Sequence, residues 1–339
     1  SELSYLSNYQ RVIINSGKIS NKGWEISVSG VPVKVKNFEW KTIFNWSKNN
    51  SMVESLPEGI DKIQIGSGVY NVKSYAEVGK PYGAIYAKTF KRDAEGYILC
   101  QLDGSPKEGQ DYEYLGCVQA DWRGGWNNVF RLGNFSFSVM FDFQKGGKFF
   151  SQTSIQSSVD GQSVKSLEGR DADFFSRKIL GESDEERYGF MRPQNANTPT
   201  ANGQIYPDWG RPKGVVLPNC RYDEDVEGLA GQQVLGYCTP ERYWMHYTSR
   251  DISRFIYDAS YVKLREITVS YDLPKKWLRK TPFQTFRVAA VGRNIATLFA
   301  NTPHGLDPQA TSTTGNAQGF ERGFNLPSAT YGFDIKVSF

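Results

Sequence analysis

The sequence has few histidines, no long apolar run and no recognisable catalytic motif. Its two histidines, His246 and His304, are 58 residues apart. No window reaches the roughly 18–20 apolar residues of a membrane-spanning helix. No P-loop, H-E-x-x-H or G-x-S-x-G motif occurs. The net charge of +4 is small, and no basic run gathers it. We therefore expect no enzyme, no cofactor or metal, no nucleic-acid partner and no helical membrane protein.

Cysteine is also scarce, with four residues at Cys100, Cys117, Cys220 and Cys238. None forms a C-x-x-C spacing, which argues against zinc. Pairing sequence neighbours would give Cys100–Cys117 and Cys220–Cys238, and an oxidising exterior would permit these bridges. Free thiols remain an equal alternative.

Aromatic residues are abundant, although the chain is hydrophilic overall. There are 21 Phe, 19 Tyr and 8 Trp among 339 residues, yet the mean hydropathy is −0.51. This combination indicates alternation, with apolar groups on one face of a strand and polar groups on the other.

Strict period-2 alternation predicts seven strands. In 134–143, for example, Phe135, Phe137, Val139 and Phe141 oppose Ser136 and Ser138. The predicted strands cover about 23–31, 37–47, 134–144, 148–158, 261–273, 285–294 and 331–339. In 261–273, Lys263 and Arg265 share a face with Ile267, which predicts either charges near a strand end or a β-bulge that switches faces.

The predicted connections alternate between short and long. Outer-membrane barrels have short periplasmic turns and longer extracellular loops. If the terminal strand runs inward, 48–133, 159–260 and 295–330 fall outside, whereas 31–37, 144–148 and 273–284 fall inside. We therefore expect an all-β fold, the C-terminal portion of a transmembrane antiparallel β-barrel with long extracellular loops. Seven strands cannot close a large barrel, and the edge at 24–31 would be exposed, so we expect the chain to be part of a longer protein.

Several motifs resemble the SusC/RagA group of TonB-dependent outer-membrane transporters, typical of Bacteroidota. They run in family order along almost the whole chain: Asn21–Glu25, Phe44–Asn49, Asp121–Asn128, Gly133–Phe135, Asp258–Glu266, Ser270–Pro274, Gly305–Gln309 and Phe339. The resemblance implies a 22-stranded barrel with a plug domain. All 339 residues of this chain would then belong to the C-terminal part of the barrel, and the plug domain would be absent from this chain.

The resemblance also implies function and partners. It implies TonB-dependent active import of a large nutrient, an oligosaccharide or peptide, across the outer membrane of a Gram-negative bacterium. A SusD-like surface lipoprotein would cover the mouth, TonB–ExbB–ExbD would act through the missing plug, and outer-membrane lipid would surround the barrel. The alternatives are a passive outer-membrane channel, a surface glycan-binding or adhesin barrel, and a soluble β-rich protein.

Candidate site residues are aromatic. Flat rings in loops can stack on sugars or pack against a partner, which makes ligand- or lid-contact candidates of Trp122, Trp126, Trp209, Tyr243 and Trp244. The same rings can instead stabilise long loops or join an aromatic girdle. The terminal Phe339 resembles the aromatic residue that the barrel-assembly machinery reads, and would also mark barrel closure.

The acidic run Asp223–Gly228 resembles the start of a calcium loop, but position twelve is Val234 where an EF-hand needs Glu. A solvated acidic turn is the preferred interpretation.

Overall fold

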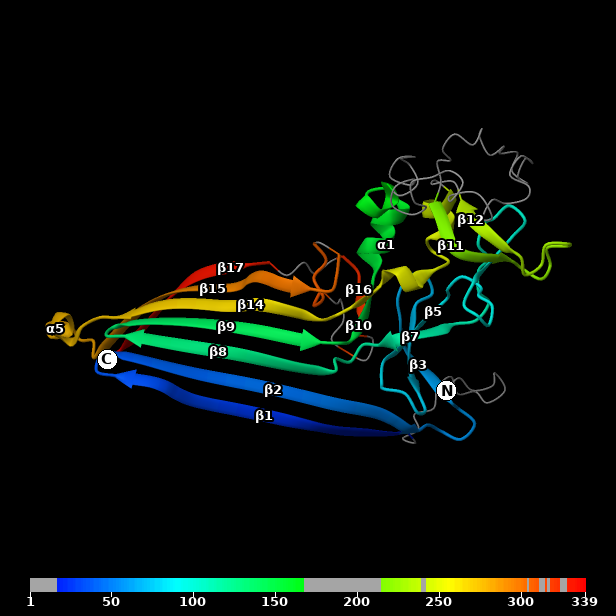
Figure 1. The fold of residues 1–339 in the computed structure, drawn as a ribbon. Helices are drawn as coiled ribbons and strands as arrows, with labels where there is room; N and C mark the ends of the chain where they lie inside the picture. The colour runs from blue at the N-terminus through cyan, green and yellow to red at the C-terminus, as the bar shows by residue number, and fades with distance from the viewer. Residues whose placement is uncertain are drawn as a thin grey trace, which may run out of the picture.

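Seven antiparallel strands form one continuous sheet in the order β1-β2-β8-β9-β14-β15-β17 (Figure 1). The computed structural model describes residues 17–167, 215–238, 242–303, 305–310, 315, 318–323 and 328–339. The strands of this main sheet are β1 (Lys18–Val35), β2 (Phe38–Ser55), β8 (Trp122–Leu132), β9 (Phe135–Lys145), β14 (Tyr261–Asp272), β15 (Thr285–Ala300) and β17 (Thr330–Ser338). Because all neighbours are antiparallel, side chains in register share a face across the sheet.

The two faces of the main sheet differ sharply in polarity. One row in register contains Phe44, Trp126, Phe141 and Leu264. The next row contains Asn45, Gly125, Asp142 and Lys263. We call the first the apolar face; its members are Trp24, Ile26, Val28, Trp40, Phe44, Trp46, Trp126, Phe130, Phe137, Val139, Phe141, Phe143, Val262, Leu264, Ile267, Val269, Tyr331, Phe333 and Ile335. The opposite one is the polar face.

Nothing among the described residues covers the apolar face. Phe333 is 85% exposed and Trp24 is 73% exposed. Large exposed apolar patches mark surfaces that meet another apolar medium or partner. Among the described residues, the helices are all too short or too polar to cross a membrane.

β-Bulges account for the apparent breaks in alternation. On β14 the register shifts between Leu264 and Glu266 against both neighbouring strands, so Arg265 is the extra residue. Lys263 pairs with Asp142 on the polar face, whereas Ile267 pairs with Val139 on the apolar face. The predicted face-switching bulge is therefore present. A second shift, between Gly30 and Val33 of β1, keeps the apolar residues of that strand on one face.

The connections divide the sheet into a turn end and a loop end. At the turn end lie the tight turns 36–37 and 133–134, the link with α5 (Lys275–Leu278) and the C-terminus (Figure 1). At the loop end lie the connections 56–121, 146–260 and 301–329. Every long connection therefore leaves the same end of the sheet.

Two strand predictions are wrong, one strand missed and one added, so the number of strands in the main sheet is still seven. Residues 122–132 were expected in a loop but form β8, which pairs with β2 and β9. Residues 148–158 were expected to form a sheet strand. They form the short β10 (Lys148–Ser151) and then helix α1 (Gln152–Val159), which begins where the Ser151 hydroxyl accepts a hydrogen bond from the Ser154 amide. The expected inside turn at 144–148 is thus the start of a long loop-end connection, and β9 runs opposite to the expected direction. The strand total and the parity of the other connections are unchanged.

The described parts of the long connections fold into a unit of their own, which we call the cap. It contains three small sheets: β3 (Lys62–Ser67), β4 (Lys73–Glu77), β5 (Ala84–Ala87) with β7 (Glu113–Cys117); β6 (Ile98–Cys100), β11 (Val215–Tyr222) with β12 (Gln233–Cys238); and β10, β13 (Ile256–Asp258) with β16 (Phe320–Glu321). The helical pieces η2 (Val164–Leu167), η3 (Tyr243–Tyr247) and η4 (Ile252–Phe255) join α1 around them. Two buried apolar clusters hold the cap together.

Candidate functional site

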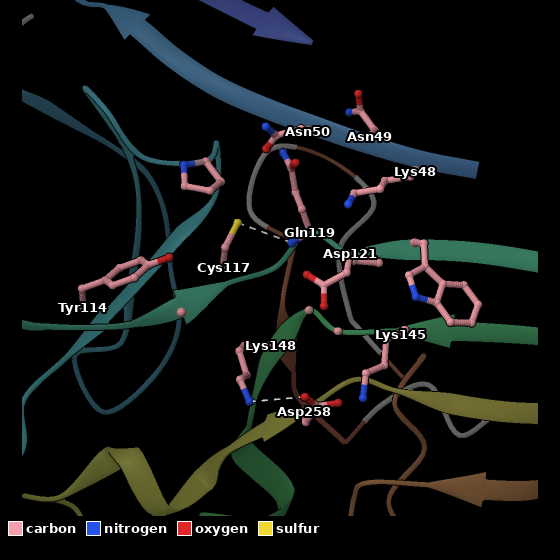
Figure 2. A pocket seen from close by; sticks show the side chains of 16 residues that line it. Lys48, Asn49, Asn50, Tyr114, Cys117, Gln119, Asp121, Lys145, Lys148 and Asp258 are labelled. Atoms are coloured by element: carbon pink, nitrogen blue, oxygen red, sulfur yellow. Dashed lines mark hydrogen bonds and ion pairs between the residues drawn. The ribbon is translucent and has the colours of Figure 1, made fainter. Parts of the chain in front are cut away.

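A polar cleft of about 760 Å³ opens where the main sheet meets the cap (Figure 2). Its walls come from the loop ends of β2, β8 and β9 and from β7 and β10. Three lysines and two aspartates line it, together with the rings of Tyr114 and Trp122; these charged residues are Lys48, Lys145, Lys148, Asp121 and Asp258. Its size falls in the range of small-molecule sites.

The cleft exists because β2 is longer than β8. The β2–β8 ladder ends at Ser47, opposite Arg123. The next backbone bonds on this side of β2 join Val53 to the cap, at Gly79 and Lys80, with N–O distances of 2.9 and 3.0 Å. The stretch between these two attachments forms one wall of the cleft.

A second hollow of about 270 Å³ lies on the polar-face side of the same junction. Ser47, Arg123 and Gln318 line it, and it shares Asn49 and Trp122 with the larger cleft. Trp122 is therefore the one predicted contact residue that the structure places beside open space on both sides, within the described part of the chain.

The polar face carries a buried ionic cluster at the loop end. Nζ of Lys263 lies 2.6 Å from each carboxylate oxygen of Asp307 and 3.0 Å from Oε1 of Gln309. Arg265 donates to Asp142 and to Gln309, the latter at 2.7 Å. The Lys263 side chain is only 5% exposed. This cluster ties the segment 305–310 to the wall, and it joins two of the motifs that carry the family resemblance.

Trp126 lies in the middle of β8 on the apolar face rather than in a loop. Its indole N–H donates to Oγ1 of Thr42 at 2.9 Å, and Trp40 donates likewise to Oδ1 of Asn128 at 3.0 Å. Thr42 and Asn128 are themselves a cross-strand pair. The position of Trp126 therefore agrees with the alternative interpretation, in which its ring is part of an aromatic surface rather than a loop contact for a ligand.

Tyr243 and Trp244 are packing residues of the cap. Their exposures are 0% and 2%, and their rings meet edge to face with centroids 5.1 Å apart. Arg254 donates to the Tyr243 hydroxyl. A fully buried ring offers no surface to a ligand, so these two residues stabilise the loop core. Trp209 lies outside the described residues.

Phe339 lies at the turn end and is 76% exposed. Its ring is 5.3 Å from that of Phe283, in the connection between β14 and β15. The last residue therefore stays on the apolar side of the turn end, accessible to another molecule.

The acidic run at Asp223 is a salt-bridge centre rather than a cation loop. Nζ of Lys107 and Nζ of Lys91 lie 2.7 and 2.9 Å from the Asp223 carboxylate, whose side chain is 4% exposed. Burial alone would raise the pKa of this carboxyl, but hydrogen bonds from Lys107 and Lys91 lower the pKa to about 2. Across the described residues, no group of His, Cys, Asp and Glu has metal-binding geometry.

The cysteines do not pair with their sequence neighbours. None of the four cysteines forms a disulfide, and Cys100, Cys220 and Cys238 share one buried cluster of the cap. Cys117 lies apart from them, beside the polar cleft. A hydrogen bond with Cys220, together with burial, raises the pKa of the Cys100 thiol. The Cys100–Cys117 pairing is therefore wrong for this structure.

Sequence reasoning missed the cleft lysines and the ionic cluster. Lys48 and Lys145 each lie two residues after the last aromatic residue of a predicted strand, and this position could have indicated that they lie at the end of the apolar face. Asp307 and Gln309 were noticed only as part of a motif, because nothing in their spacing shows which strand they contact.

No protein-family model matches the chain. Among curated proteins, it is 24% identical over 341 residues to TonB-dependent receptor P3 of Formosa agariphila, which covers 94% of the chain and 28% of that receptor. It is 28% identical over 156 residues to TonB-dependent receptor P26 of the same organism, covering 40% of the chain and 16% of that receptor.

Solved structures agree on the fold. The chain is similar to the RagAB peptide transporter, with a TM-score of 0.56 and 15% identity over 99% of this chain and 31% of that one. The RagAB peptide importer in the open-open state gives a TM-score of 0.56 at 16% identity, covering 100% of this chain and 31% of that one. The chain thus spans less than a third of the length of the first relatives it matches.

The fold class follows from the sheet and from these likenesses. It is all-β, and its antiparallel main sheet corresponds to a portion of the β-barrel fold of the proteins to which the chain is similar. The relatives are named receptors and the similar structures are named transporters, not enzymes.

Proposed function

We propose that this chain forms part of the barrel wall and the extracellular cap of a transporter that imports a large nutrient across the outer membrane with energy from TonB. The observation that carries the proposal is a seven-stranded sheet with one uncovered apolar face, one charged face and all long connections at one end. The likeness to TonB-dependent receptors over 94% of the chain supports it.

The placement in the membrane follows from the two faces. The apolar face meets lipid, since a charge facing lipid at mid-membrane would cost about 2–4 kcal/mol. The polar face, with the Lys263 cluster, meets the lumen. The turn end with Phe339 lies in the periplasm, where the barrel-assembly machinery reads it. The cap lies outside the cell.

The partners belong to the two sides of this wall. A SusD-like surface lipoprotein covers the cap, and the TonB–ExbB–ExbD complex acts on a plug that the rest of the transporter supplies. The cargo is an oligosaccharide or a peptide; the similar RagAB structures are those of a peptide transporter and importer. The ring of Trp122, the cleft and the adjoining hollow offer the cap's contact surface beside the lumen.

An uptake experiment tests the proposal. The gene that encodes the chain is deleted, and growth on single oligosaccharides or peptides is compared with that of the parent and of a TonB-deficient strain. The proposal expects one nutrient whose uptake is lost equally in both mutants. Uptake that survives loss of TonB but not loss of this gene would instead support a passive channel.

A further inference from the structure

Charged residues on the apolar face occur only at the loop end of the seven strands, within the described residues. Lys22 lies two positions before Trp24 on β1, and Lys48 lies two positions after Trp46 on β2. Lys145 lies two positions after Phe143 on β9, opposite Trp122. All other charged side chains of these strands, apart from the Lys18–Glu54 pair at the same end, belong to the polar face or to a bulge bonded to it.

We call Lys22, Lys48 and Lys145 the basic row. Its members occupy the boundary where the aromatic surface ends and the cap begins. All three are exposed. Of the two carboxylates that line the neighbouring cleft, Asp258 forms a salt bridge with Lys148, with an N–O distance of 3.4 Å.

No member of the basic row forms a salt bridge with a carboxylate in the part of the chain that the structure describes. The nearby Glu54 pairs instead with Lys18, at 2.5 Å. The Asp121 carboxylate lies against Gly146, where a Cβ would be 2.4 Å from Oδ2. Lysines without an internal partner keep their charge available for an external anion.

Lys48 and Lys145 also point to the same recess. Both line the polar cleft with Lys148 and Trp122. Figure 2 shows the three lysines among the residues around this cleft. An amphipathic ring beside a lysine above an apolar surface is the arrangement found at a membrane–water interface. A phosphorylated lipid placed there would lay its chains on the aromatic surface and its phosphates beside the lysines.

We propose that the basic row and the adjoining cleft bind the phosphate groups of an anionic membrane glycolipid in the leaflet at the loop end. This rests on the membrane placement proposed above and adds a lipid site that the transport function does not require. Among the described residues, no strand of the main sheet has a matching lysine on its apolar face at the turn end; the basic residues there, such as Lys275 and Lys276, lie in the α5 link beyond the strands.

The test compares two lipids that differ in phosphate alone. The protein, as its gene encodes it, is purified from membranes in a nonionic detergent and titrated with phosphorylated lipid A or with its dephosphorylated form. Each basic group near a membrane surface contributes about fivefold in affinity, from about 1 kcal/mol per lysine. The triple variant Lys22→Gln, Lys48→Gln, Lys145→Gln is therefore expected to lose on the order of a hundredfold for the phosphorylated lipid.

The matched control removes three lysines away from this boundary: Lys36→Gln in the turn, with Lys41→Gln and Lys336→Gln on the polar face. It should bind like the wild type. The charge-preserving variant Lys22→Arg, Lys48→Arg, Lys145→Arg should also bind, which separates loss of charge from loss of fold. Equal loss in control and basic-row variants, or no loss in either, would overturn the proposal.

Two further experiments distinguish a lipid site from a general anion site, and distinguish failure of the lipid site from failure of the membrane placement. Competition by inorganic phosphate at millimolar concentration that abolishes lipid binding would show an anion site rather than a lipid site, and would overturn the proposal. Recovery of the wild type outside the membrane fraction would overturn the placement itself. A membrane-bound wild type with equal affinity for both lipids would overturn only the lipid site.

Discussion

Two tryptophans of the apolar face find hydrogen-bond acceptors within that face. Trp40 and Trp126 each carry an indole N–H, and Asn128 and Thr42 accept these hydrogens at 3.0 and 2.9 Å. An unpaired N–H facing hydrocarbon would cost several kcal/mol. Two polar residues in an otherwise apolar surface thus allow tryptophan to be used there.

We expect Asn128→Ala to destabilise the barrel by about 1–3 kcal/mol, because Trp40 would lose its acceptor. Thermal unfolding in detergent measures the change. Asn127→Ala is the control, since the neighbouring residue belongs to the polar face, and it should change stability by less than about 0.5 kcal/mol. Adding Trp40→Phe to Asn128→Ala should restore most of the loss; failure to do so would contradict the assigned pair.

Asp223 gives the cap a pH-dependent contribution. Its pKa falls from 3.8 to about 2 because Lys107 and Lys91 outweigh the effect of burial. A lowered pKa means that the stabilisation is present above the unfolded value of 3.8 and is lost as the pH falls through about 2.

Asp223→Asn should therefore lower cap stability by about 2 kcal/mol at neutral pH. The difference in melting temperature between wild type and variant should hold from pH 7 to about pH 5 and shrink toward pH 2. Asp225→Asn is the control, because that carboxylate is 70% exposed and contacts Lys107 alone among the described partners. A difference that persists unchanged at pH 2 would refute the assignment.

At the scale of elements, the sequence predicts strands where both faces keep their pattern. β9 has Phe or Val at every second position from Phe135 to Phe143, and the prediction found it. β8 was missed because its apolar face contains Gly124 and Asn128. Both have physical reasons: a Cβ on Gly124 would lie 2.2 Å from the Phe143 ring, and Asn128 accepts from Trp40. Neither reason is visible without the neighbouring strand.

Helix α1 was predicted as strand because Phe149 and Phe150 precede it. Gly146 and Gly147 both have positive φ, at 73° and 82°, and they turn the chain out of the main sheet. Beyond Ser151, Ile155 and Ser158 are buried at helical rather than strand spacing. The candidate site residues were mispredicted for a similar reason. The sequence does not show whether a long loop forms a hydrophobic core of its own, and Tyr243 and Trp244 belong to such a core.

The link between Lys263 and Asp307 fixes a loop-end segment to the wall. Removing one partner of a buried pair costs about 3–5 kcal/mol, so Lys263→Met and Asp307→Asn should each lower stability by about that amount. The double variant should lose less than the sum, with a coupling of about 1–3 kcal/mol in a thermal double-mutant cycle.

The control cycle uses Arg293 and Glu266, a pair that joins β15 to β14 with N–O distance 3.0 Å and side chains 67% and 34% exposed. Its coupling should stay below about 1 kcal/mol. Equal coupling in the two cycles would show that burial of Lys263 does not set the strength of the link.

At the scale of the molecule, the alternation of short and long connections between the two ends of the sheet is predicted more reliably than any single strand. The prediction missed 122–132 and wrongly added 148–158, and both errors lie between the turn-end connections at 36–37 and 273–284, on either side of the 133–134 turn. The predicted outside segments 48–133, 159–260 and 295–330 therefore still overlap the loop end. Alternating short and long connections depend on the membrane crossing itself, whereas single strands depend on local neighbours.

The central claim is that the cap lies outside the cell and the turn end in the periplasm. The most direct measurement places one epitope tag in the exposed cap turn beside Glu95, and another beside Lys280 at the turn end. Antibody binding is then compared on intact and lysed cells. We predict that the Glu95 tag is detected on intact cells and the Lys280 tag only after lysis. Detection of the Lys280 tag alone on intact cells, or of neither tag in the membrane fraction, would contradict the account.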